Sequence, residues 1–225
     1  MKKVDVEISE TIAFIRIDDG KVNAAGFDML EELNSAIDLV EDRSDCVILS
    51  GRPGLLSGGF DLSVLNGGDA KEINALVKLG IKTLMRLFGF RKPLIIIAPG
   101  HAVALGAFML LAADYRIGVK GDFKIGLNET AIGLPIPLFG ISLVQARLNP
   151  KYIARAAFSA ELFNPEDSVE VGFLDFVADE DNLEKEAKKV AARLKKLDMA
   201  AFENTKMAFR RQTIDRVLEH TEKNF

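Results

Sequence analysis

The sequence contains a single cysteine, and it has no apolar run long enough to cross a membrane. One cysteine excludes a disulfide within the chain, and the place of Cys46 in the apolar run CVILS is typical of a small buried hydrophobic residue. The N-terminal stretch MKKVDVEISE has two lysines but lacks the apolar segment of a secretory signal. No stretch approaches the roughly 18 consecutive apolar residues of a membrane span. These absences predict a cytoplasmic protein.

An excess of positive charge is also missing. The chain carries 29 Lys and Arg against 33 Asp and Glu, a formal net charge of -4, so neither a nucleic-acid nor a membrane partner is expected. With two histidines, no cluster shows metal-ligand spacing and no Ser-His-acid order can be assembled, and we expect no metal. The composition is that of a globular protein, 48% hydrophobic and 28% charged, and the length of 225 residues predicts one main domain.

What the sequence does contain is an alternation of strand and helix patterns. The stretches KVDVEIS and TIAFIRID alternate apolar and polar residues and predict a β-hairpin. Further strands are predicted at CVILS, LIIIAPG, YRIGV, DFKIGL and FLDFVA. Helices are predicted over residues 26–40, 74–90, 102–115, 136–148, 151–159, 183–197 and 200–218, and the third is apolar all round, which indicates a buried helix. Strands alternating with helices predict an α/β fold with a helical C-terminal region.

Two stretches combine glycines, the end of a strand and a following helix, at residues 57–65 and 100–106. Both place backbone N–H groups near a helix N-terminus, where an oxyanion or a phosphate is favoured. Neither stretch fits the phosphate loop with its Lys-Ser/Thr or the dinucleotide fingerprint of three spaced glycines. Each stretch alone is more often just a tight turn.

Five ordered blocks give the sequence a specific resemblance to the crotonase (enoyl-CoA hydratase/isomerase) superfamily. They are IAFIRIDDGKVNAAGFDMLEELNSAI, LSGGFDLSVL, KPLIIIAPGHAVALGAFMLLAADYRIG, FKIGLNETAIGLPIP and NPEDSVEVGFLDFVADEDNLEKEAKKVAARL. The resemblance implies an α/β spiral of ββα repeats over residues 1–178, with a helical region at 179–225 for assembly or as a lid. It also implies acyl-CoA thioester substrates, CoA being part of the substrate with no separate cofactor, and a homotrimer or hexamer.

The resemblance also assigns roles to individual residues. The backbone N–H groups of Phe60 and Leu105 match the oxyanion hole that binds the thioester oxygen, and their side chains would trim the pocket. Preorganised donors of this kind stabilise an enolate as it forms. Glu129 matches one of the two glutamates of the hydratases, and Phe108 occupies the position of the other. The remaining substrate-binding positions are Gly58, near the CoA adenine, and Leu134 and Pro135, which would contact an apolar acyl tail.

A single carboxylate favours moving a double bond over adding water, because one base can shuttle a proton from C2 to C4. We therefore favour a Δ3,Δ2-enoyl-CoA isomerase. A hydratase, in which His101 could assist Glu129, and a non-catalytic acyl-CoA binding protein remain open. Glu129 could also be only an acid at a helix N-terminus.

Other ionisable residues have simpler interpretations. Asp61 and Asp114 are expected to be structural, His101 to pack or hydrogen-bond, and His220 to be solvated. Four cations could contact CoA phosphates, although each is more often a plain surface charge: Lys21, Lys71, Lys206 and Arg210.

Overall fold

The computed structural model describes residues 2–225, and the larger of the two sheets in this part of the chain has six strands in the order β1-β2-β3-β5-β7-β9. These strands are β1 (Val4–Ser9), β2 (Ile12–Ile17), β3 (Cys46–Ser50), β5 (Leu94–Ala98), β7 (Tyr115–Val119) and β9 (Phe176–Ala178). The pair β1 and β2 forms the predicted antiparallel hairpin, and the later neighbours are parallel. All of β5 is buried, as in a parallel sheet covered on both faces.

A smaller parallel sheet contains β4 (Gly54–Ser57), β6 (Gly100–Val103) and β8 (Ile125–Gly126), in the order β4-β6-β8. Along the chain, consecutive strands alternate between the sheets: β3, β5 and β7 join the larger sheet, and β4, β6 and β8, which follow them, join the smaller one. Helix α1 (Phe27–Glu41) follows the first hairpin. Helices α2 (Leu62–Gly67) and α3 (Ala70–Phe88) follow β4, α4 (Leu105–Ala112) follows β6, and α5 (Leu138–Arg147) follows β8. This arrangement confirms the predicted α/β spiral of ββα repeats.

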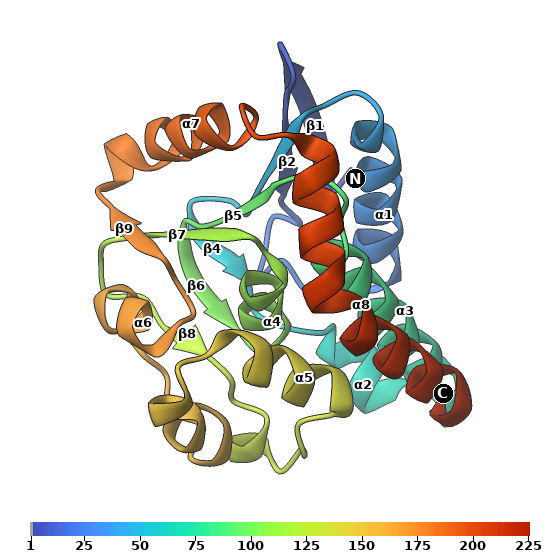
Figure 1. Cartoon of the computed structure of the whole chain (residues 1–225). Helices are drawn as coiled ribbons and strands as arrows, with labels where there is room; N and C mark the ends of the chain where they lie inside the picture. Colours follow the sequence, from blue (N-terminus) through green and yellow to red (C-terminus); the bar gives the residue numbers. More distant parts are fainter. Residues whose placement is uncertain (1) are drawn as a thin grey trace.

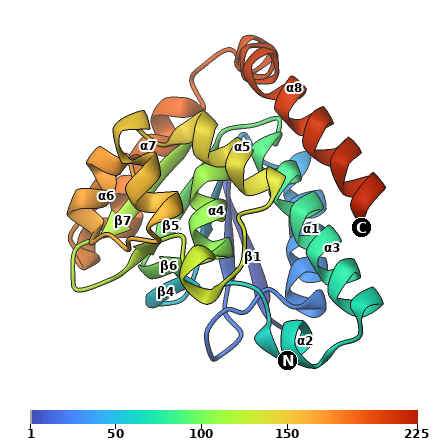
Figure 2. The same ribbon diagram turned by 90° about the horizontal axis from the view of Figure 1, so that it is seen from below.

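The C-terminal helices share the core of the preceding repeats. Beyond α6 (Pro165–Val171) lie α7 (Leu183–Leu194) and α8 (Met199–Asn224). The buried face of α7, Leu183, Ala187 and Ala191, packs on the isoleucines of β3, β5 and β7. Helix α8 lies against α3 and α5, with Val217 in the main core (Figures 1 and 2). A role of this region in assembly or as a lid stays a prediction.

Helix α4 occupies the centre of the molecule, as Figure 2 shows. All eight of its residues are buried, which confirms the prediction of a helix surrounded by protein. Its start is not where the sequence pattern placed it, because Ala102 and Val103 belong to β6, which pairs with β4 and β8. Strand pairing with distant segments overrides the helical character of this apolar run.

Two further boundaries are wrong. The predicted strand over residues 122–127 is reduced to the two residues of β8. The predicted helix over residues 151–159 is a short 3-10 turn, η2 (Pro150–Tyr152), followed by a π-helix, η3 (Ala154–Phe158). The remaining short turns are η1 (Thr130–Ile132) and η4 (Glu180–Asn182).

Cys46 is fully buried on β3, and this burial raises the pKa of its thiol to about 12. The prediction of a small buried hydrophobic residue at this position is confirmed. Among residues 2–225, no helix combines the length and apolar character that crossing a membrane requires.

Candidate functional site

Three turns meet at one edge of the smaller sheet. Because β4, β6 and β8 are parallel neighbours, their carboxyl ends lie together. Beyond those ends the chain continues into residues 58–61, 104–105 and 127–129. The fold therefore brings together the three segments that contain Phe60, Leu105 and Glu129, and we call their common edge the mouth.

The first two turns are in direct contact. A Cβ on Gly59, whose φ is +117°, would lie 3.2 Å from the Cβ of Ala104. A Cβ on Gly106 would lie 2.4 Å from the carbonyl oxygen of Ser57. Glycine at these two positions thus allows the turn before Phe60 and the start of α4 to approach each other.

The N–H group of Phe60 faces away from the segment that holds its turn. Residue 60 forms a parallel bridge with Ala25, in which the Ala25 N–H donates to the Gly59 carbonyl at 2.9 Å and the Asp61 N–H donates to the Ala25 carbonyl at 3.4 Å. Ala25 thus bonds to the residues on either side of Phe60. In a parallel bridge of this kind, the N–H and carbonyl groups of the residue between them, Phe60, point to the opposite side. Within residues 2–225 the Phe60 N–H donates to no protein acceptor, so it is available to a ligand.

Leu105 is the first residue of α4, and its N–H also has no acceptor within the described chain. The preceding residue, Ala104, has φ 52° and ψ -118°, and its own N–H donates to the Gly126 carbonyl at 3.0 Å. The first N–H groups of a helix lack partners in the helix and carry its positive dipole end. Two free amides therefore lie on adjacent turns, as an oxyanion hole requires.

The strained backbone at Ala104 gives a testable expectation. A non-glycine residue in such a conformation costs about 1–3 kcal/mol, and glycine offsets part of the gain through its greater freedom in the unfolded chain. We expect Ala104→Gly to raise the free energy of unfolding by about 1 kcal/mol, measured by urea denaturation. Ala36→Gly, within α1, should lower it by a similar amount. A decrease at both positions would contradict the assignment of strain to residue 104.

A hydrogen-bonded pair that the sequence analysis missed holds the first turn. The Ser57 hydroxyl donates to the Asn23 carbonyl at 2.7 Å, and the Asn23 amide donates to the carbonyls of Leu56 and Ile17, both at 3.0 Å. Both side chains are almost fully buried. No local sequence pattern pairs residues that lie so far apart, and the positive φ of 49° at Asn23 is visible only in three dimensions.

Glu129 lies three residues beyond Gly126, the last residue of β8, at the third turn. Its side chain is half-buried, and within residues 2–225 its buried Oε2 has no hydrogen-bond partner. Burial raises the pKa of this carboxyl above its ordinary value of 4.5. The neighbouring Asn128 Oδ1 is likewise buried and without a partner in the described chain. A carboxylate of this kind can take a proton and return it.

The raised pKa predicts a specific pH dependence of stability. Between the unfolded and native pKa values of Glu129, the native state binds the additional proton, so its contribution to the free energy of unfolding falls as pH rises. Glu129→Gln cannot ionise and should therefore gain stability relative to the parent protein as pH rises from the unfolded pKa toward the raised native one. Urea denaturation of both proteins at several pH values measures this. Parallel curves would contradict the burial of a charged carboxylate.

The side chains around the two amides are placed differently from the expectation. The Leu105 side chain is 2% exposed and packs in the interior with Met29 and Leu33 of α1, so the prediction that it trims the pocket is wrong. The Phe60 ring lies on Gly80 of α3, where a Cβ would come within 2.4 Å of it. The cause is the direction of the turn, which presents the amides outward and sends these side chains toward the helices.

Phe108, in α4, is 2% exposed and meets Phe139 edge to face, with ring centroids 5.0 Å apart. A Cβ on Gly140 would come within 2.7 Å of its ring and of Ile136. It thus lies in apolar surroundings against the start of α5. Of the remaining predicted substrate contacts, Gly58 is exposed in a mouth segment. Leu134 and Pro135 are exposed beyond η1, where the Leu134 N–H donates to the Glu129 carbonyl at 2.9 Å.

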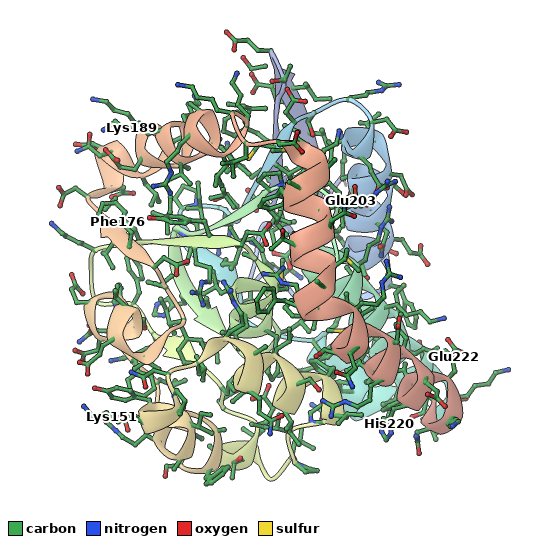
Figure 3. All side chains as sticks on the ribbon, in the orientation of Figure 1. Lys151, Phe176, Lys189, Glu203, His220 and Glu222 are labelled. Carbon is green, nitrogen blue, oxygen red and sulfur yellow. The ribbon has the colours of Figure 1, made fainter. Side chains whose placement is uncertain are left out.

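The acid beside the first amide and the nearby histidine have structural roles, as predicted. Asp61 is the N-cap of α2 and accepts from the Ser63 N–H at 2.9 Å and hydroxyl at 2.6 Å; the hydroxyl bond is the main cause of its lowered pKa. The Nδ1 of His101 accepts from the Lys124 N–H at 3.0 Å, and its ring packs edge to face on Phe123. His220 is exposed near the end of α8 (Figure 3).

Two of the cations considered for CoA phosphates are instead buried. The Lys206 ammonium lies 2.7 Å from Asp114 Oδ2, and the Arg210 guanidinium lies 3.0 Å from Asp114 Oδ1. Lys206 and Arg210 are only 7% and 9% exposed. For these two residues, the prediction of a contact with CoA phosphates and the alternative of a plain surface charge are both wrong. Lys21 and Lys71 are exposed. The prediction that Asp114 is structural is confirmed.

Comparisons with known proteins give a consistent result. A model of the enoyl-CoA hydratase/isomerase family matches residues 7–224. The crystal structure of an enoyl-CoA hydratase/isomerase family protein from Pseudomonas syringae is 40% identical with a TM-score of 0.95, over 99% of this chain and 96% of that chain. Mitochondrial enoyl-CoA delta isomerase 1 of Rattus norvegicus is 27% identical over 223 residues, 97% of this chain and 77% of the relative. Crotonyl-CoA hydratase of Syntrophomonas wolfei is 24% identical over 202 residues, 86% of this chain and 75% of the relative.

Proposed function

The chain belongs to the enoyl-CoA hydratase/isomerase family, and we propose that it is an isomerase that moves the double bond of a Δ3-enoyl-CoA to the Δ2 position. The thioester oxygen would accept from the N–H groups of Phe60 and Leu105. Glu129 would remove a proton from C2, the electrons would pass to the thioester oxygen, and Glu129 would return the proton at C4. The proposed reaction uses no cofactor, because CoA is part of the substrate.

One observation carries the choice of reaction: at the mouth, the half-buried carboxylate of Glu129 has an oxygen without a partner among residues 2–225 and a raised pKa. The position that holds the second glutamate in hydratases is occupied, by resemblance, by Phe108, which is buried among apolar side chains. A lone base can shuttle a proton between two carbons, whereas hydration also requires the activation of water.

A hydratase is the second candidate, and one feature of the mouth favours it. Asn128 Oδ1 and Glu129 Oε2 are adjacent buried acceptors, each without a partner among residues 2–225. Together they could accept both hydrogens of a water molecule and so orient it for addition. A non-catalytic acyl-CoA binding protein is the third candidate.

Two parallel assays separate these candidates. With a Δ3-enoyl-CoA as substrate, we expect the ultraviolet absorbance of the conjugated Δ2 thioester to appear. With a Δ2-enoyl-CoA as substrate, we expect this absorbance to fall slowly or not at all. Hydration faster than isomerisation would establish the second candidate, and binding of both thioesters without turnover would establish the third.

Assembly as a homotrimer or hexamer and a cytoplasmic location remain predictions from the sequence. Sedimentation of the purified protein tests the first, and fractionation of cells tests the second.

A further inference from the structure

A cleft of about 640 Å³ lies between the first half of α8 and the ends of α3 and α5. Its apolar walls are formed by Phe88, Leu197, Ala201, Phe202 and Phe209. The volume falls within the range of about 300–1,000 Å³ that is usual for small-molecule sites. Asp114, at its base, follows the C-terminal end of α4, whose eight residues span about 12 Å from Leu105. The cleft is therefore separate from the mouth.

The base of this cleft has more positive than negative charge. Arg147, Lys206 and Arg210 line it together with two carboxylates, Asp114 and Asp198. Asp114 pairs with Lys206 and Arg210, and Asp198 caps α8 by accepting from the Ala201 N–H at 2.7 Å. Within residues 2–225, Arg147 has no carboxylate at ion-pair distance.

Arg147 is the cation that lacks compensation. One of its terminal nitrogens donates to the Ala113 carbonyl at 3.0 Å, while its buried Nε has no acceptor in the described chain. Burial, together with the charges of Arg116 and Arg210, lowers its pKa to about 10. The Arg147 side chain as a whole is half-buried. A buried N–H without an acceptor is costly, so such groups are normally paired.

We propose that this cleft binds an anionic amphiphile, whose carboxylate or phosphate group accepts from Arg147 and whose apolar body lies against Phe202 and Phe209. The anion would balance the surplus cation, and the guanidinium is suited to both carboxylate and phosphate. The apolar body follows from the walls, since Phe209 is 84% exposed and an exposed aromatic side chain gains from being covered. This site is independent of the proposed isomerase activity.

Thermal unfolding with three probes tests the proposal. Decanoate is expected to raise the Tm, decanol at the same concentration to leave it nearly unchanged, and inorganic phosphate to act more weakly than decanoate. Arg147→Met should weaken decanoate binding by about 10- to 100-fold. Arg211→Met, which removes an exposed arginine of α8, is the matched control and should bind decanoate normally.

A second variant covers the case in which Arg147→Met fails to fold. Ala201→Trp, at an exposed position of α8 that lines the cleft, should fill it, leave the cations in place and abolish the decanoate effect. The proposal would be overturned if decanoate and decanol raised the Tm equally, or if Ala201→Trp bound decanoate normally. It would also be overturned if inorganic phosphate bound as strongly as decanoate. Loss of decanoate binding in Glu129→Gln would likewise overturn it, because it would locate decanoate at the mouth. An oligomer in sedimentation whose assembly excludes decanoate would also overturn it.

Discussion

Replacing Glu129 with glutamine is expected to lower kcat/KM for isomerisation of a Δ3-enoyl-CoA by about 10²–10⁴-fold, the usual contribution of a general base. Glutamine preserves the volume and one oxygen of the side chain but cannot accept and return a proton. Because the thioester oxygen would be held by two backbone amides, the substitution leaves that contact in place. The loss should therefore appear in kcat, with KM nearly unchanged.

The pH dependence of the parent enzyme provides a second measurement on the same residue. The base acts in its ionised form, so kcat/KM should rise with pH through one pKa that lies above the ordinary 4.5 of a glutamate. Glu31→Gln, on the exposed face of α1, is a matched control and should keep full activity. A Glu129→Gln enzyme as active as Glu31→Gln would refute the assignment of the base, whereas an inactive parent protein that binds thioesters would refute the proposed reaction itself.

The segments with strong periodicity could be predicted from the sequence. The hairpin of β1 and β2, the buried strands β3 and β5 and the amphipathic α1 follow from residue patterns that local physics interprets directly. The buried character of α4 followed from its composition. The candidate site residues came from the resemblance, because a lone acid such as Glu129 has no pattern that separates a base from a helix-terminal charge.

The parts that could not be predicted depend on contacts between distant segments. The strands β4 and β6 are four residues each, and their pairing, Gly54 with Gly100 and Leu55 with His101, is what makes them strands. The positive φ of Ala104 is imposed by its place between β6 and α4. Lys206 and Arg210 carry the same charge as exposed residues of α8, and only the approach of Asp114 from another element buries them. Sequence periodicity carries no information on such contacts between distant segments.

Asp114→Ala is expected to lower the free energy of unfolding by about 3–5 kcal/mol, the usual effect of removing one partner from a buried ion pair. The Asp114 carboxylate accepts from the Leu94 N–H at 2.8 Å and pairs with Lys206 and Arg210. Its loss leaves both cations buried beside Arg147 without a carboxylate. Urea denaturation measures the change. Asp122→Ala is the control, since the Asp122 side chain is 99% exposed and should cost almost nothing.

The pH dependence and a second substitution distinguish loss of charge compensation from loss of packing. Burial lowers the native pKa of Lys206 to about 8, so the native state binds fewer protons than the unfolded chain above that pH, and this residue's contribution to stability rises with pH. Without Asp114 the native pKa of Lys206 falls further. The difference in the free energy of unfolding between the parent protein and Asp114→Ala should therefore narrow as pH rises toward about 10. Adding Lys206→Met should recover part of the lost stability, because the uncompensated cation is gone. A deficit that neither pH nor Lys206→Met reduces would mean that the carboxylate acts mainly through its bond to the Leu94 N–H, and the charge argument for this cluster would then fail.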